Sequence, residues 1–199
     1  MKIILLIIAI VSSAFSLTIN ESMLKVHSVL VPKILLMDYK IKDKLQNSTI
    51  KIAIMYKNSE YKYASSLKNK IDIRYKNGIK SYKITTKLVR YKNIKNVDAN
   101  IYYLFPSNEK DVQNTVKQAY KNNALTFAYL KDDLKYGIMI SLNVSKKIKT
   151  VLNLDAVKKY EISLRPMLIE ISNIYRPKVN IAPYKLNFIK LYYSEIRIV

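Results

Sequence analysis

The stretch from Gly137 to Ala156, "GIMISLNVSKKIKTVLNLDA", decides the fold. Every second residue from Ile138 to Val144 is a branched aliphatic side chain, and a second strand-like segment from Ile148 to Leu154 follows the polar triplet 145–147. This pattern predicts a β-hairpin. Gly137 is one of only two glycines in 199 residues. At the start of the hairpin, a residue without Cβ can take a positive φ or let a neighbouring backbone come close.

Two helices are predicted after the hairpin. Asp155 can accept the free backbone amides of a short helix from Ala156 to Tyr160, because a carboxylate makes a good N-cap. Ser163 can cap a second helix in the same way. The apolar residues of that helix share one face: Leu164, Met167, Leu168, Ile171, Ile174 and Tyr175.

The chain before the hairpin alternates strand patterns with helix patterns. The expected strands are residues 49–56, 81–91, 100–105 and 124–130. The expected helices are an amphipathic segment from Ser22 to Leu45, which Pro32 should kink or split, a segment after Ala64, and a third from Val112 to Tyr120. We therefore expect a single α/β domain, with a mixed sheet flanked by helices on both faces in a three-layer sandwich and a C-terminal β-hairpin and helix.

The first sixteen residues, "MKIILLIIAIVSSAFS", have the features of a secretory signal. Lys2 precedes the apolar run from Ile3 to Val11, and a small-x-small cleavage pattern ends at Ser16. An uncleaved anchor is less favoured, because a bilayer-spanning helix needs about 20 apolar residues. The predicted organisation is a signal peptide at 1–16, an α/β domain at 17–175 and a tail at 176–199, with the mature protein in the periplasm.

The charge and the missing cysteines restrict the function. A formal charge of +21 would suit nucleic acid, but lysines make up 30 of the 35 basic residues, occur mostly singly and form no binding motif. Export further disfavours nucleic acid and leaves an acidic partner or an anionic membrane surface. Without cysteine the chain has no disulfide, thiolate metal site or thiol nucleophile.

Signals for catalysis are nearly missing. His27 is the only histidine, and two glycines cannot build a phosphate-cradling loop. Ser-x-x-Lys matches occur, but so many lysines produce them by chance. The Asp132-Asp133 pair is more simply a solvated turn than a ligand pair. We expect no enzyme activity, no cofactor and no metal.

The segment from Tyr136 to Tyr175, "YGIMISLNVSKKIKTVLNLDAVKKYEISLRPMLIEISNIY", resembles the C-terminal signature of the YfiR-type periplasmic domain. In that family a glycine, a hairpin, an Asn-Leu-Asp-Ala step and a leucine-rich helix occur in this order. The resemblance extends upstream to about Met23. It marks Gly137, Asn153 and Asp155 as motif residues with a structural role.

The resemblance also implies a function. The best-understood members of the family repress a membrane-bound diguanylate cyclase by binding its periplasmic part. We therefore expect a regulator that binds the extracytoplasmic part of a membrane signalling protein, a diguanylate cyclase or a histidine kinase, through His27, Asp38 and Tyr39 on the leading helix. A homodimer is compatible with this expectation. The missing cysteines rule out redox sensing through thiols in this chain.

Two other functions remain open. A small-solute binding protein would hold its ligand at the carboxyl ends of the strands, where the loops after Tyr56 and Phe105 should converge. A hydrolase would have to use His27. The apolar stretch "LNFIKLYYSEIRIV" in the tail should pack on the domain or dock a partner, and its deletion without loss of solubility, stability or binding would contradict that expectation.

Overall fold

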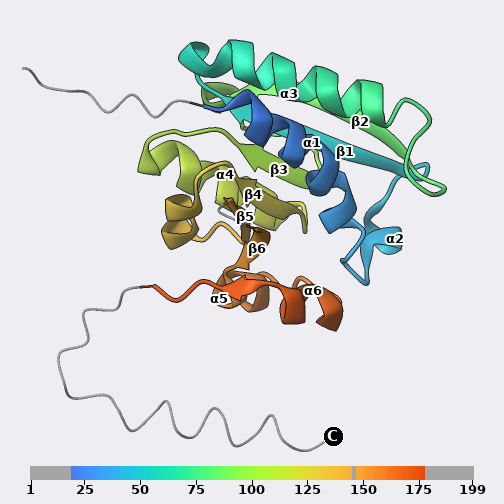
Figure 1. Cartoon of the computed structure of the whole chain (residues 1–199), viewed down its shortest axis with the longest axis vertical. Coiled ribbons are helices and arrows are strands. Elements are labelled where there is room, and N and C mark those ends of the chain that lie inside the picture. The colour runs from blue at the N-terminus through green and yellow to red at the C-terminus, as the bar shows by residue number, and fades with distance from the viewer. Residues whose placement is uncertain (1–18, 145–146, 178–199) are drawn as a thin grey trace, which may run out of the picture.

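A computed structural model describes residues 19–144 and 147–177 (Figure 1). The predicted signal peptide at 1–16, nearly all of the tail and part of the hairpin turn lie outside the described residues. In the part that is described, the chain forms one sheet with helices packed on it, as the sequence predicts.

Seven strands form the sheet in the order β2-β1-β3-β4-β5-β6-β7. Strands β1 to β5 run parallel to one another, β6 pairs antiparallel with β5 to form the expected hairpin, and β7 pairs parallel with β6. The strand bounds are β1 Thr49–Tyr56, β2 Lys83–Arg90, β3 Ile101–Leu104, β4 Leu125–Ala128, β5 Ile140–Val144, β6 Ile148–Leu152 and β7 Asn173–Ile174. The predicted strand positions are confirmed.

The chain changes direction across the sheet at β1. From β1 it moves outward to β2 and then returns to β3 on the other side of β1. In open parallel sheets such a switch point leaves a crevice at the carboxyl ends of the two strands, because the connecting loops diverge there. This arrangement places the loops after β1 and β3 next to each other.

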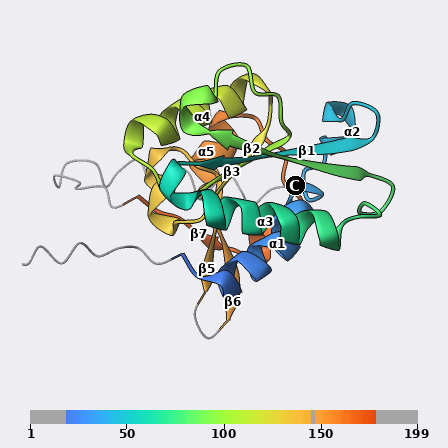
Figure 2. The same cartoon turned by 90° about the horizontal axis from the view of Figure 1, so that it is seen from above.

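Helices cover both faces of the sheet, and Figure 2 shows α1 and α3 on one side with α4 on the other. The longer helices are α1 Glu21–Leu35, α3 Tyr61–Arg74 and α4 Glu109–Lys121, and the short ones are α2 Ile41–Lys44, α5 Leu154–Lys159 and α6 Pro166–Ile171. The leading helix passes through Pro32 and ends at Leu35, so the predicted split occurs a turn later than the proline.

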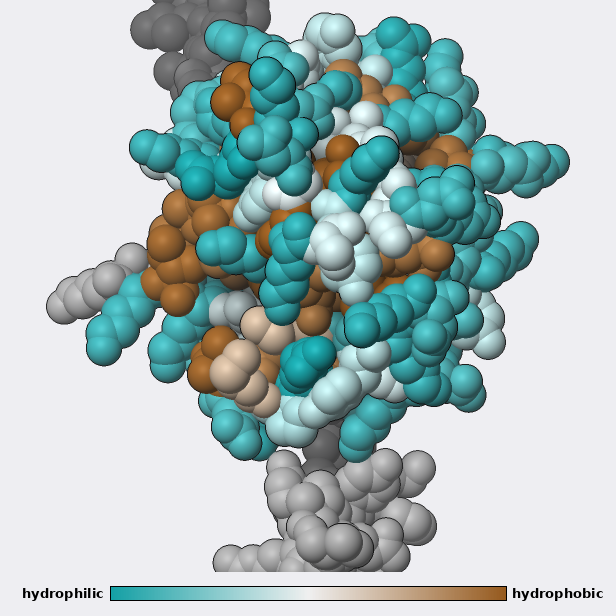
Figure 3. All heavy atoms as spheres, turned by 90° about the vertical axis from the view of Figure 1, so that its right-hand side faces the viewer, coloured by the Kyte–Doolittle hydropathy of each residue, from teal (hydrophilic) through white to brown (hydrophobic). Residues whose placement is uncertain are grey.

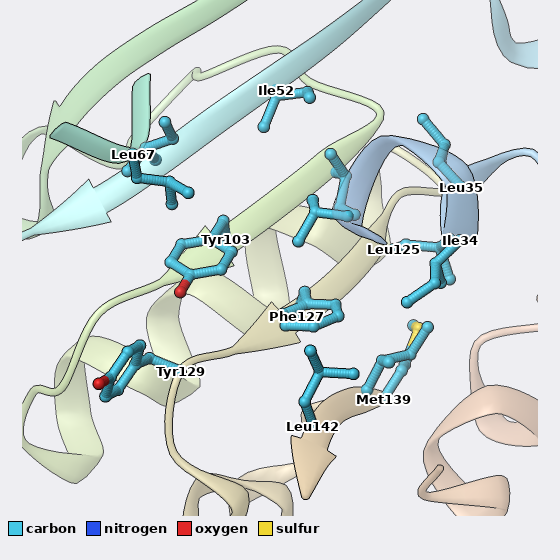
Figure 4. Close-up of a cluster of buried hydrophobic side chains, with 14 of the residues drawn as sticks. Ile34, Leu35, Ile52, Leu67, Tyr103, Leu125, Phe127, Tyr129, Met139 and Leu142 are labelled. Carbon is cyan, nitrogen blue, oxygen red and sulfur yellow. The ribbon is translucent and has the colours of Figure 1, made fainter. Parts of the chain in front are cut away.

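The core on the α1 side is built around aromatic rings from the central strands (Figure 4). Tyr103 on β3 and Phe127 on β4 stack with ring centroids 5.7 Å apart. Every residue of β3 and β4 is buried. Strands that are covered on both faces need the continuous apolar composition that these segments have.

The C-terminal part differs from the prediction in the residues that begin its two helices and in the residue at which the second helix ends. Asn153, rather than Asp155, caps α5, because its side chain accepts from the Ala156 amide at 3.1 Å. Ser163 caps no helix, since α6 begins at Pro166, whose ring fixes the φ that a first helical residue needs. The second helix is shorter than predicted, because residues 173 and 174 form a strand that pairs with β6.

Gly137 has a φ of +91°, which confirms the first of its two expected roles. A Cβ at this position would meet Val116 Cγ1 at 3.6 Å, an ordinary contact distance. The glycine is therefore required by backbone conformation and not by a close approach.

We expect Gly137→Ala to lower the free energy of unfolding by about 1 to 2 kcal/mol, the cost of placing a Cβ residue in the left-handed region. Gly78→Ala should cost more, because its Cβ would lie 2.3 Å from the backbone oxygen of Tyr82. Urea unfolding of the two variants measures both values. An equal cost at the two sites would contradict the assignment.

Candidate functional site

The structure places His27 in the core and not on a surface. Its side chain is 0% exposed, and Nδ1 lies 2.7 Å from the Tyr103 hydroxyl. The rings of Phe127 and Tyr129 also pack against the imidazole. Burial lowers the pKa of His27 to about 4, so the ring is neutral at physiological pH. A neutral, enclosed imidazole is out of reach of a partner protein.

Asp38 is buried too, at 1% exposure, and has a structural role. Its carboxylate accepts from Lys44 Nζ at 2.6 Å and from the Lys40 amide at 3.0 Å. Its backbone forms an isolated antiparallel bridge with Leu164. Asp38 thereby holds the chain after α1 against the segment that leads into α6.

Tyr39 is the one residue of the three predicted contact residues that reaches solvent, at 56% exposure. Its backbone amide donates to the Ser163 oxygen at 2.7 Å, and the Arg165 amide donates to the Met37 oxygen at 2.8 Å. The guanidinium carbon of Arg165 lies 4.9 Å from the centroid of the Tyr39 ring. This cation–π contact fixes the aromatic ring at the surface.

Apolar side chains of α6 continue the exposed area beside Arg165. Met167 is 54% exposed and Ile171 is 60% exposed. We call Tyr39, Arg165, Met167 and Ile171 the Tyr39 surface. It lies on the side of the molecule that carries α2 and α6, where Figure 3 shows apolar patches separated by polar side chains.

A cleft of about 400 Å³ lies at the carboxyl edge of the sheet. It brings together the loop after β1, the loop after β2 and the first turn of α4, which follows β3. Its lining includes Tyr56, Arg90, Tyr91 and Asp111. Asp111, in the segment after β3, lines this cleft together with Lys57 and Asn58 after β1, so the two segments meet as the sequence predicts.

A buried acid lies near this cleft. Asp133 is only 6% exposed, and its Oδ2 has no hydrogen-bond partner among the described residues, so the expectation of a solvated turn is wrong for this residue. Burial raises the pKa of Asp133 to about 6. The Tyr91 hydroxyl donates to the Phe105 oxygen. The pKa of the Tyr91 hydroxyl is raised well above the usual value by burial and by the charges of Asp133, Asp111 and Glu60.

Sequence reasoning missed Tyr91, and it assigned Asp133 to a solvated turn although this residue is buried. The available signal was position, since Tyr91 directly follows β2 and Asp133 lies in the loop after β4. Polar residues at the carboxyl ends of parallel strands collect at one edge of the sheet. The motif residues Gly137, Asn153 and Asp155 lie together at the base of the hairpin, with Asn153 also donating to the Leu134 oxygen at 2.9 Å.

The described residues contain no group of three or more histidine and acidic side chains that could hold a metal ion. Within residues 19–144 and 147–177, no helix has the length and apolar character to cross a bilayer. The described residues thus form a mixed α/β domain with a cleft at one edge of its sheet and an exposed aromatic ring at its surface.

The family model described as YfiR/HmsC-like matches residues 41–173, and the chain belongs to this family. The match confirms the resemblance that the hairpin motif indicated. No curated protein matches the sequence.

Among solved structures, a conserved domain protein from Vibrio cholerae is similar at a TM-score of 0.55 and 12% identity, over 77% of this chain and 60% of that one. An ABC domain in complex with L-Trp from Streptococcus pneumonia has a TM-score of 0.46 and 10% identity over 71% and 60% of the chains. A substrate-binding protein with adhesive properties from Clostridium difficile has a TM-score of 0.49 and 13% identity over 64% and 54%. The chain thus spans 54% to 60% of the length of these structures, and the first of them shows a shared fold.

Two buried titratable groups, His27 and Asp133, make opposite contributions to the free energy of unfolding between pH 4 and 6.5. The lowered pKa of His27 makes the folded state bind fewer protons than the unfolded state, so stability falls as the pH drops through this window. The raised pKa of Asp133 makes the folded state bind more protons, so stability falls as the pH rises from about 4 to about 6. In the wild type these two dependences of the free energy of unfolding on pH partly cancel.

We expect Asp133→Asn to raise the free energy of unfolding at pH 7 by up to about 3 kcal/mol. In this variant the free energy of unfolding should rise with pH between pH 4 and 6.5, because only the His27 contribution remains. His27→Phe should leave the opposite slope, with stability falling as the pH rises. Urea unfolding at pH 4, 5, 6 and 7 for the wild type and both variants measures the slopes. Variants with parallel curves would contradict the assignment.

Proposed function

We propose that this protein is an exported, non-enzymatic regulator that binds the extracytoplasmic part of a membrane signalling protein. A diguanylate cyclase is the first candidate for the partner and a histidine kinase the second. Membership of the YfiR/HmsC-like family supports the proposal. The structural observation that carries it is the Tyr39 surface, where an aromatic ring and an arginine are exposed beside apolar side chains.

The residue types of the Tyr39 surface suit protein recognition. Tyrosine and arginine are enriched among residues that contribute most to binding energy, because both bury a large area and keep a polar group. Tyr39 is already held by Arg165 before any partner arrives, which lowers the ordering cost of association. Met167 and Ile171 add apolar area that water would leave on binding.

The charge of the chain fits a partner that is acidic. A formal charge of +21 produces a positive field around the protein, which speeds encounter with a negatively charged surface and weakens as salt rises. Association should therefore slow at high ionic strength, while the contacts of the Tyr39 surface set the dissociation rate.

A second candidate function is binding of a small solute, and the cleft at the carboxyl edge favours it. Its volume of about 400 Å³ would admit a molecule of metabolite size. Under this alternative the protein would respond to a ligand without any partner. A library of small metabolites that leaves the melting temperature of the mature protein unchanged would exclude this alternative.

The test of the leading proposal is crosslinking and affinity capture of the tagged mature protein from its native cell envelope, followed by mass spectrometry. We expect a membrane signalling protein in near-equal amount. Tyr39→Ala should reduce its recovery by about tenfold or more, because a central aromatic anchor is lost. Tyr120→Ala is the matched control, since Tyr120 on α4 is 53% exposed and lies outside the Tyr39 surface.

Recovery of the protein alone, even after crosslinking, would contradict the regulator proposal and direct attention to solute binding. Equal recovery with Tyr39→Ala and with the wild type would keep a regulator but remove the Tyr39 surface as its contact site. Circular dichroism of both tyrosine variants confirms that they are folded before capture.

A further inference from the structure

Strand β2 forms one edge of the sheet and has β1 as its only strand partner among the described residues. The Lys83 amide donates to the Ser48 oxygen at 3.0 Å, so it faces β1. Backbone groups of successive residues in a strand point to alternate sides. The amides of Ile84, Thr86 and Leu88 therefore face outward, where no described strand accepts from them.

A groove lies on one face of the sheet, over β1 and β2 and along the segment that follows β2. It consists of three connected hollows of about 350, 250 and 400 Å³. Lys87 and Val97 line both of the first two, and Tyr56 and Arg90 line both of the last two. The groove thus follows the length of β2 to the carboxyl edge of the sheet.

The two faces of β2 differ in character. Lys83 and Lys87 are exposed on the face of the groove, whereas Ile84 and Leu88 are half-buried on the opposite face. An extended chain added to the edge would point every second side chain to the face of Lys83 and Lys87, and the others to the face of Ile84 and Leu88. These two kinds of neighbour give specificity when a peptide adds to a sheet, while the main chain supplies hydrogen bonds.

The charges along β2 select the kind of chain that can bind. Lys83, Lys87 and Arg90 are exposed on the strand. The acids beside β2 are already paired, Asp98 with Lys51 at 2.6 Å and Asp72 with Lys68 at 2.5 Å. Lysines on a sheet edge commonly prevent pairing with another copy, because the same charges would face each other. They repel a second copy of this chain, whereas they attract an acidic segment.

We propose that the free edge of β2 binds an extended, acidic segment of a partner protein by strand addition. The inference goes beyond the proposed function, because it specifies the conformation and the charge of the bound segment and a surface distinct from the Tyr39 surface. The outward amides of Ile84, Thr86 and Leu88 would donate to the added strand.

The test uses the mature protein and a synthetic peptide of eight residues, the length of β2, that alternates glutamate with valine. We expect the exchange of the Ile84, Thr86 and Leu88 amides, followed by NMR, to slow by about tenfold or more when the peptide is bound. The inward amides of Lys83, Thr85 and Lys87 should exchange at an unchanged rate, because they are bonded to β1 in both states. A peptide with lysine in place of glutamate should not bind.

Charge reversal supplies the matched control. Lys83→Glu with Lys87→Glu should weaken peptide binding by about tenfold or more, whereas Lys117→Glu with Lys121→Glu on the exposed side of α4 gives the same net charge and should have little effect. Equal losses in the two double variants, or unchanged exchange at the outward amides, would overturn the proposal. Capture of a membrane signalling protein that is unaffected by the β2 variant would overturn it too, and would leave the proposed function standing.

Discussion

The burial of β3 and β4 on both faces is the constraint on which the rest of the structure depends. These strands consist entirely of buried residues, so each face requires its own cover of helices. Helices α1 and α3 fulfil this on one side and α4 on the other (Figure 2). With both faces occupied, binding is restricted to the rims: the carboxyl edge of the sheet, the free edge of β2 and the surface where the chain returns at α6.

The buried polar side chains of His27, Tyr91 and Asp133 lie either in the core beneath α1 or where the strands end. His27 enters the aromatic core from α1 and shares a hydrogen bond with Tyr103, which keeps a neutral ring in an apolar setting. Tyr91 and Asp133 lie at the carboxyl edge, where the parallel strands stop and backbone oxygens such as that of Phe105 need donors. The core is thus closed by polar side chains at one end, next to the cleft.

The sequence allowed the architecture to be predicted but not the exposure of single residues. Strands such as β1 were predictable, because β-branched runs between turn residues have few alternatives. The cap of α5 was misplaced by two residues, since Asn153 and Asp155 are equally good caps and only the register of the hairpin separates them. The burial of His27 and Asp38 depends on contacts with Tyr103 and Leu164, which are far away in the sequence and leave no local pattern.

The bridge between Asp38 and Leu164 has a consequence for the order of folding. It joins the end of the first helix to nearly the last described segment, so it can close only when the chain between them has been made, and its loop-closure entropy is large. Tyr39 and Arg165 come into contact through this same closure. In a chain that emerges amino end first from a membrane, the Tyr39 surface would be assembled last. Incomplete chains would then expose their leading helix without presenting a surface that a partner can recognise.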